Sequence, residues 1–179
     1  MTTSESAGGK AKVVTGLFRG SESVESAYGV ISERGYGIGD INVLMSDETR
    51  RHYFSDDRQV KTELGLKIEE GGELGGPMGG TVGTVIPAAI ALGLLAIPGL
   101  GLVLAGPVAV ALAAAGAAGL TVGLIGLLGD WGVPEERAKQ YETGISNGGI
   151  LLSVTPRSDE DARHFKQQWD AMGGEHVHG

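Results

Sequence analysis

The sequence predicts an α+β protein, a split βαβ ferredoxin-like domain with an inserted apolar Gly/Ala-rich helical hairpin. Three observations support this fold class: a strand–helix–strand pattern near the amino end, a second one near the carboxyl end, and a long uncharged segment between them. We expect a disordered leader at 1–11, the first half of the domain at 12–73, the apolar helical hairpin at 74–129 and the second half at 130–179.

The first half begins with a strand, a helix and a second strand. The runs KVVTGLF and INVLMS are apolar and contain β-branched residues, which is typical of strands. Because a crossover helix joins these strands, they should lie parallel. Gly35 suits the left-handed conformation that ends a helix, and the charged residues that begin at Asp47 predict an exposed loop or a short helix. The apolar face of the crossover helix should consist of Val24, Ala27, Tyr28 and Ile31.

The second half predicts a helix followed by a second strand–helix–strand unit. Pro134, followed by two glutamates, marks the start of the first helix. The run ILLSVTP predicts a strand, and Ser158 or Asp159 should cap the helix that follows it. The terminal EHVHG predicts a short edge strand. The apolar face of the last helix should consist of Ala162, Phe165, Trp169 and Met172.

The central segment, from Leu74 to Gly129, contains no Asp, Glu, Lys, Arg or His. The motif IPGLG predicts a turn that divides it into two helical arms, at 80–97 and 102–128. With a rise of about 1.5 Å per residue, the second arm can cross a hydrocarbon core about 30 Å thick, whereas the first arm is marginal. A chain of 179 residues has too little other surface to cover both arms, so we expect lipid or other copies of the protein to cover them.

Small residues recur at every fourth position of this segment, which places them on common helix faces. Such rows let two helix backbones approach closely, as in the small-xxx-small packing of membrane helices. Trp131, which follows the second arm, is expected to be a membrane-interface anchor or, equally, a core residue. The residues expected to mediate helix packing and oligomerisation are Gly79, Gly83, Ala105, Ala109, Ala113, Ala117, Ala111, Ala115, Gly119 and Gly123.

Composition narrows the classes of function. A formal net charge of -8 argues against nucleic-acid binding, which requires a basic patch. The absence of cysteine excludes disulfides and thiolate catalysis. The amino terminus lacks the apolar core of a secretory signal, so we expect both termini on the cytoplasmic side of an inner membrane or, alternatively, a soluble cytoplasmic assembly.

The sequence offers few candidates for catalytic, phosphate-binding or metal-binding residues. The glycine-rich loops lack the Lys-Ser/Thr pair of a P-loop, and we find no convincing set of nucleophile, base and acid. We therefore expect no enzymatic activity and no cofactor. His176 and His178 should share one face of the terminal strand, where Glu175 or His164 would complete a metal site.

Two blocks of sequence flank the apolar core: VVTGLFRGSESVESAYGVISERGYGIGDINVL and WGVPEERAKQYETGISNGGILLSVTPRSDEDA. Together they resemble the bacterial general stress protein 17M-like (YflT-type) domain family, over residues 12–177. The most specific part is WGVPEE with the YE and GG pairs that follow it. The resemblance implies a bacterial, often stress-induced protein without an established activity, and it supplies no catalytic residues. Many relatives carry a similar apolar middle, whereas the simpler members lack it.

These observations predict a non-enzymatic, stress-associated membrane protein. Its α/β domain would face the cytoplasm, and its hairpin would insert into the bilayer and associate with other copies of the chain. The alternative is a soluble homo-oligomer, such as a ring, shell or filament, in which the hairpins bury one another. A third possibility is a small-ligand or metal-binding module that uses His176 and His178.

Overall fold

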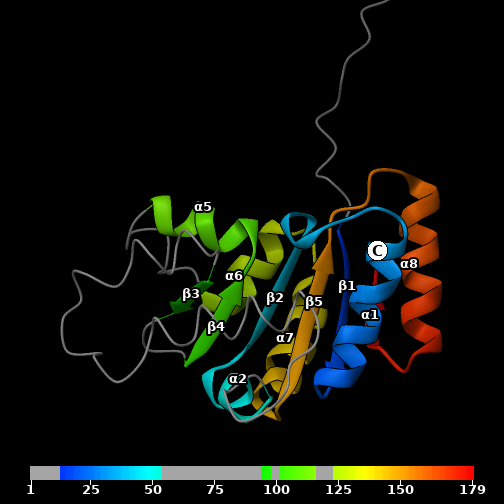
Figure 1. Ribbon diagram of the computed structural model, residues 1–179. Helices are drawn as coiled ribbons and strands as arrows, with labels where there is room; N and C mark the ends of the chain where they lie inside the picture. Colours follow the sequence, from blue (N-terminus) through cyan, green and yellow to red (C-terminus); the bar gives the residue numbers. More distant parts are fainter. Residues whose placement is uncertain (1–12, 54–93, 98–100, 116–122) are drawn as a thin grey trace, which may run out of the picture.

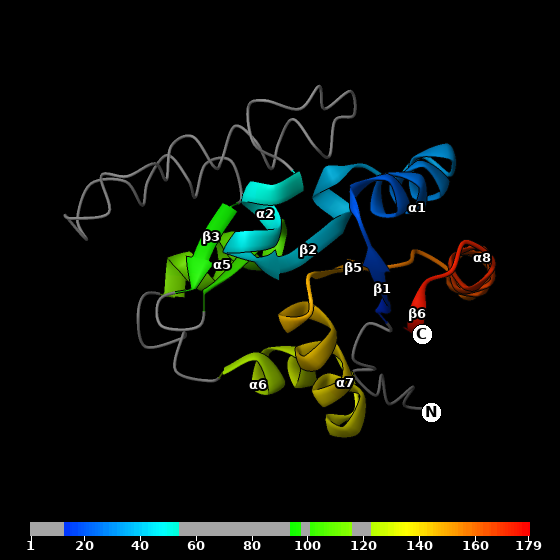
Figure 2. The same ribbon diagram turned by 90° about the horizontal axis from the view of Figure 1, so that it is seen from below.

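The computed structural model describes residues 13–53, 94–97, 101–115 and 123–179, which form an α+β structure with helices on both faces of an antiparallel sheet (Figures 1 and 2). The leader expected at 1–11 lies outside the described residues, as does most of the first expected helical arm.

The secondary structure of the two flanking halves follows the sequence pattern closely. The first half contains β1 (Val14–Arg19), α1 (Ser21–Glu33), the 3-10 helix η1 (Ile38–Asp40), β2 (Ile41–Ser46) and α2 (Asp47–Tyr53). The second half contains α7 (Glu135–Ser146), β5 (Gly149–Val154), α8 (Asp159–Ala171) and β6 (Glu175–His178). The strand–helix–strand units expected in both halves are therefore confirmed.

The sheet also contains β3 (Leu94–Ile97) and β4 (Leu102–Ala105) from the central segment. Its strand order is β3-β4-β2-β5-β1-β6, and every neighbouring pair is antiparallel. Strands β1 and β2 both pair with β5, which lies between them, so they run parallel to each other as predicted. Strands β5 and β6 both pair antiparallel with β1, so they also run parallel to each other. The two strand–helix–strand units are therefore interleaved, which no local sequence pattern specifies.

Helices α1 and α8 cover one face of the sheet (Figure 2). The ring of Trp169 on α8 meets Phe18 of β1 edge-on, with 5.5 Å between the ring centroids. Its indole nitrogen donates a hydrogen bond of 3.2 Å to the carbonyl oxygen of Ala27 on α1, which joins the two helices. Met172 was expected on the same buried face but is 39% exposed, because α8 ends at Ala171.

Three helices lie on the opposite face: α5 (Pro107–Ala115), α6 (Gly123–Asp130) and α7, which packs closely against the sheet (Figure 2). Gly144 of α7 makes this approach possible, since a Cβ atom there would collide with Leu17 of β1. Helices α6 and α7 carry further buried residues of this layer, which are Leu124, Leu127, Leu128, Ala138, Tyr141 and Ile145.

The expected helical hairpin is wrong on both sides of its turn, at 94–97 and 102–105, whereas the described remainder of the second arm, after Gly106, is helical as expected. The described part of the central segment forms a β-hairpin, β3 (Leu94–Ile97) and β4 (Leu102–Ala105), followed by α5 (Pro107–Ala115) and α6 (Gly123–Asp130). The turn expected at IPGLG is confirmed, because β3 and β4 pair antiparallel on either side of it. The residues of β4 form a strand because β2 offers an edge for pairing, and such tertiary pairing outweighs local helix preference.

Part of the apolar segment is buried within the domain itself. Leu104 and Leu128 are completely buried, and Ala109 is 1% exposed. The expectation that only lipid or other copies could cover this segment is therefore wrong for these residues. Within the described ranges, no helix combines the length and the apolar character needed to span a bilayer.

Candidate functional site

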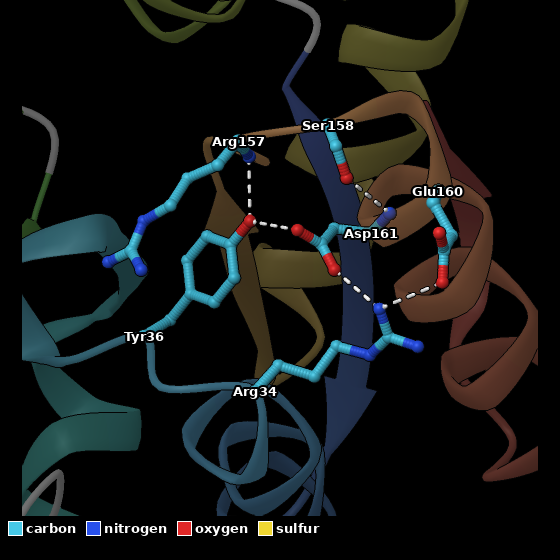
Figure 3. Close-up of polar contacts among 6 residues, drawn as sticks. All are labelled: Arg34, Tyr36, Arg157, Ser158, Glu160 and Asp161. Atoms are coloured by element: carbon cyan, nitrogen blue, oxygen red, sulfur yellow. Dashed lines mark hydrogen bonds and ion pairs between the residues drawn. The ribbon is translucent and has the colours of Figure 1, made fainter.

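A network of polar side chains joins the segment after α1 to the start of α8 (Figure 3). The hydroxyl of Tyr36 accepts a hydrogen bond of 2.6 Å from the backbone nitrogen of Arg157 and donates one of 2.7 Å to Asp161. Arg34 bonds the other carboxylate oxygen of Asp161 at 2.6 Å and approaches Glu160 at 3.6 Å. The guanidinium of Arg157 stacks over the Tyr36 ring, 4.1 Å from its centroid.

This network sets the charge state of its central groups. Hydrogen bonds from Tyr36 and then Arg34 lower the pKa of the Asp161 carboxyl, whereas burial raises the pKa of the Tyr36 phenol. Ser158 caps α8 as predicted, because its hydroxyl accepts a 3.1 Å hydrogen bond from the backbone nitrogen of Asp161. The polar groups of the network thus bond to one another, and the arrangement fixes the start of α8 against the loop after α1.

A second polar network lies beneath α7. The hydroxyl of Tyr141 donates to the carbonyl oxygen of His176 at 2.5 Å and lies 2.9 Å from the hydroxyl of Thr15. Arg137 donates to the same carbonyl oxygen at 3.0 Å. Burial raises the pKa of Tyr141, so its phenol stays protonated and available as a donor. This network ties α7 to β1 and to the edge strand β6.

The histidines expected to bind metal do not gather enough ligands. No group of three or more His, Cys, Asp or Glu residues in the described part of the chain is arranged to hold a metal ion. Glu175, one of the two expected third ligands, forms a bidentate ion pair with Arg19, at 2.7 and 3.1 Å. Burial, followed by the charges of Arg137 and Lys166, lowers the pKa of His178. The structure therefore does not support a metal site at His176 and His178.

An open cleft of about 640 Å³ lies where β1 and β2 end and β5 begins. Its lining is mostly polar, and several of these groups bond within the chain: Arg19 pairs with Glu175, and the hydroxyls of Ser46 and Thr49 lie 2.7 Å apart. His52 and Asn147 also line the cleft. It has the size of a small-molecule site, but it lacks the enclosed apolar lining that such sites usually have.

The far end of the sheet, made of β3, β4 and α5, is here named the uncharged end. Its position is fixed by Asn42 of β2, whose side-chain oxygen accepts a 2.9 Å hydrogen bond from the backbone nitrogen of Val108 at the start of α5. Gly106 has φ 119, and a Cβ atom there would collide with the carbonyl oxygen of Ile41. The chain can therefore turn from β4 into α5 at this point only with glycine.

The uncharged end also exposes apolar residues. Val110 of α5 is 41% exposed, and Ala111 beside it is exposed as well. Ala96 of β3 is exposed, and β3 pairs with β4 alone among the described residues. Among the described residues, the uncharged end therefore combines an apolar surface with a strand edge that has no partner, and such an edge can pair with a strand of another chain.

The first expected row of small residues, which begins at Ala105, does not form a continuous helix face. Ala105 lies in β4, whereas Ala109 lies buried in α5 and faces the sheet, so the first row is interrupted at Gly106. Gly79, Gly83, Ala117 and Gly119 lie outside the described residues. Three further members fall within the bounds of helices, Ala113 and Ala115 in α5 and Gly123 at the start of α6.

Trp131 is a core residue, which was one of the two possibilities that the sequence left open. Its side chain is 9% exposed and belongs to the apolar cluster beneath α6 and α7, so it is not an interface anchor.

Sequence reasoning missed both polar networks and the contact made by Asn42. One signal was present for Asn42, which stands as a polar residue inside the apolar strand INVLMS. The Tyr36 and Tyr141 networks join residues more than a hundred positions apart, which no spacing rule connects.

Comparisons with family models, with curated proteins and with solved structures give no match to this chain.

Proposed function

We propose that the protein is a non-enzymatic, stress-associated bacterial protein that forms homo-oligomers through the uncharged end of its sheet. The single observation that carries this proposal is the placement of the described apolar segment. It extends the sheet by β3 and β4 and exposes Val110 and Ala111 beside β3, which pairs with β4 alone among the described residues. The stress association and the bacterial origin rest on the sequence resemblance alone.

The finer fold that we propose for the domain is ferredoxin-like. In that arrangement two βαβ units interleave, so that each pair of parallel strands is separated by a strand of the other unit. The order β2-β5-β1-β6, with α1 and α8 together on one face, supports this assignment. The additions to it are β3 and β4 at one edge and the layer of α5, α6 and α7 on the second face.

Electrostatics supports self-association at the uncharged end. Each chain has a formal net charge of -8, so two copies repel each other at most orientations. The run from Leu74 to Gly129 carries no charge, and its strands β3 and β4, with α5 beside them, lie at one end of the sheet. Contact there joins surfaces of β3, β4 and α5, which carry no charged side chains.

The length of the uncharged run favours a second candidate function, membrane association. In this case the apolar segment inserts into a bilayer while both halves of the domain remain on one side. The β-hairpin and the burial of Leu104 and Leu128 count against it, because these residues already belong to the core of the domain. We therefore rank it below self-association.

Extraction behaviour separates the two candidates. The untagged chain would be expressed in bacteria, and the cells lysed without detergent. Membranes washed with alkaline carbonate would then be floated through a density gradient, and the soluble fraction measured by light scattering. We expect a soluble protein with the mass of two or more chains. Protein that floats with lipid and dissolves only in detergent would instead support the membrane candidate, and a soluble monomer at all concentrations would refute both.

A further inference from the structure

The two edges of the sheet differ in how they are protected from pairing with another strand. At one edge, β6 departs from regular strand geometry: His176 has φ 54, and its register with β1 shifts between Thr15 and Leu17. The backbone carbonyl of His176 is bonded by Tyr141 and Arg137, and the ion pair between Arg19 and Glu175 adds charge. Charges and bulges of this kind prevent edge-to-edge association.

At the other edge, β3 has none of these protections among its described residues. Its sequence, LLAI, has no charge and no proline, and its pairing with β4 is regular over Leu94–Ile97. The helix beside it, α5, presents exposed Val110 and Ala111. An edge of this kind offers a row of backbone donors and acceptors to an incoming strand.

We propose that the β3 edge pairs antiparallel with the β3 edge of a second copy of this chain, so that the two sheets become one. The proposal rests on the proposed self-association and specifies its geometry. A second copy fits this edge because an apolar surface without charge is complementary to itself, which a two-fold interface requires. It also fits because no basic or acidic group on β3, β4 or α5 would select a charged partner.

The symmetry of such a dimer makes a definite prediction about register. A two-fold axis that relates antiparallel strands stands perpendicular to the sheet, so it keeps α1 and α8 of both copies on the same side. The axis then passes between one residue of β3 and the same residue of the second copy, and these two residues lie directly opposite each other. Directly opposed residues in antiparallel strands have Cα atoms about 4.5–5.5 Å apart, which is within the range that a disulfide spans.

The absence of cysteine from the natural sequence makes this register testable. Single cysteines would be introduced at the four positions of β3, as Leu94→Cys, Leu95→Cys, Ala96→Cys and Ile97→Cys, and oxidised with copper phenanthroline at micromolar protein. We expect a covalent dimer to form most rapidly at one position, with a clear fall at both neighbours, whose side chains point to the opposite face. The matched control is His176→Cys on the exposed surface of β6, which should form no covalent dimer under the same conditions.

A second variant tests the same edge without oxidation. Ala96 is exposed, so Ala96→Lys places a positive charge on the edge without disturbing the core. We expect the dissociation constant of the dimer to rise about tenfold or more, because the short interface then contains two like charges close to its axis. The circular dichroism spectrum and the urea midpoint of the monomer should remain those of the unchanged chain.

The outcomes separate this inference from the proposed function. An oligomer that persists in Ala96→Lys, and that cross-links equally slowly at all four β3 positions, would overturn the pairing while leaving self-association intact. Slow alkylation of the β3 cysteines in a monomeric protein would show that the chain itself covers this edge. That result would overturn both the strand pairing and the proposed self-association. Rapid cross-linking of His176→Cys would move the interface to the β6 edge and overturn the inference.

Discussion

On the face of the sheet that meets α1 and α8, the buried strand residues are apolar, whereas the face that meets α5 and α7 carries a polar row across three neighbouring strands. This row consists of Thr15 in β1, Ser153 in β5 and Asn42 in β2, which lie opposite one another in the register. Thr15 meets Tyr141 of α7, and Asn42 caps α5. The apolar face contains Val14, Phe18, Ile41, Val43, Met45, Ile150, Leu152 and Val154.

The difference reflects what each helix offers to the sheet. Helices α1 and α8 bury large apolar side chains such as Trp169 and Phe165 against the strands, and their polar contacts join them to each other and to the loop after α1. Helix α5 is composed almost entirely of Ala and Val, and such a surface has no feature that selects one orientation. Hydrogen bonds from buried polar groups supply that selection, because an unpaired partner in the interior costs free energy.

The largest effect is expected on the apolar face. Trp169→Ala should lower the free energy of unfolding by about 3–5 kcal/mol, because the indole is completely buried against Phe18 and its removal leaves a cavity. Urea denaturation followed by fluorescence of the remaining Trp131 would measure this change. Met172→Ala is the control: the sequence pattern placed Met172 on the same helix face, but its exposure predicts a change within about 0.5 kcal/mol. Similar losses in the two variants would contradict the structure of α8.

The next effect tests the connection into the uncharged end. Gly106→Ala should cost about 3 kcal/mol, because alanine is strained at φ 119 and its Cβ atom collides with the carbonyl oxygen of Ile41. The control is Gly101→Ala at the other end of β4, where φ is 61 and no atom lies within 4 Å of the added Cβ. That variant should cost about 1 kcal/mol. Urea midpoints that rank the two variants in the reverse order would show that β4 does not dock as described.

A smaller effect tests the polar row itself. Tyr141→Phe should lower the free energy of unfolding by about 1–2 kcal/mol, because it removes the hydrogen bonds to Thr15 and to the carbonyl oxygen of His176. A double-mutant cycle with Thr15→Val would isolate the pair, and we expect a coupling energy of about 0.5–1.5 kcal/mol. Additive effects would mean that the two hydroxyls do not stabilise each other.

The smallest effect is a pH dependence at the start of α8. Because the pKa of Asp161 is lowered in the folded protein, its contribution to stability is present above the ordinary pKa of an aspartate and is lost as the pH falls through the lowered value. Asp161→Asn should therefore flatten the loss of stability in acid, with urea midpoints compared between pH 7 and pH 3. Tyr36→Phe removes the first donor to this carboxylate and should change the profile in the same direction, but less. An unaltered acid profile in Asp161→Asn would contradict the ionised state of this network.

Much of the local structure was predictable from the sequence. The face of α1 that contains Val24 and Ile31, the strand INVLMS and the Ser158 cap all follow from side-chain periodicity and capping chemistry, which act within a few residues. These rules succeed in the two flanking halves because there the local preference and the tertiary environment agree.

The sequence by itself determined the two strand–helix–strand units, their parallel strands and the position of the turn between β3 and β4. Only the tertiary structure decided that Leu102–Ala105 pair with β2 as a strand, because the open edge of β2 offers hydrogen bonds that a helix there would forgo. It also decided the interleaved strand order, the burial of Trp131 and the contacts of Tyr36 and Tyr141. These features join residues distant in sequence, so their free energy depends on the assembled sheet and leaves no periodic trace in the chain.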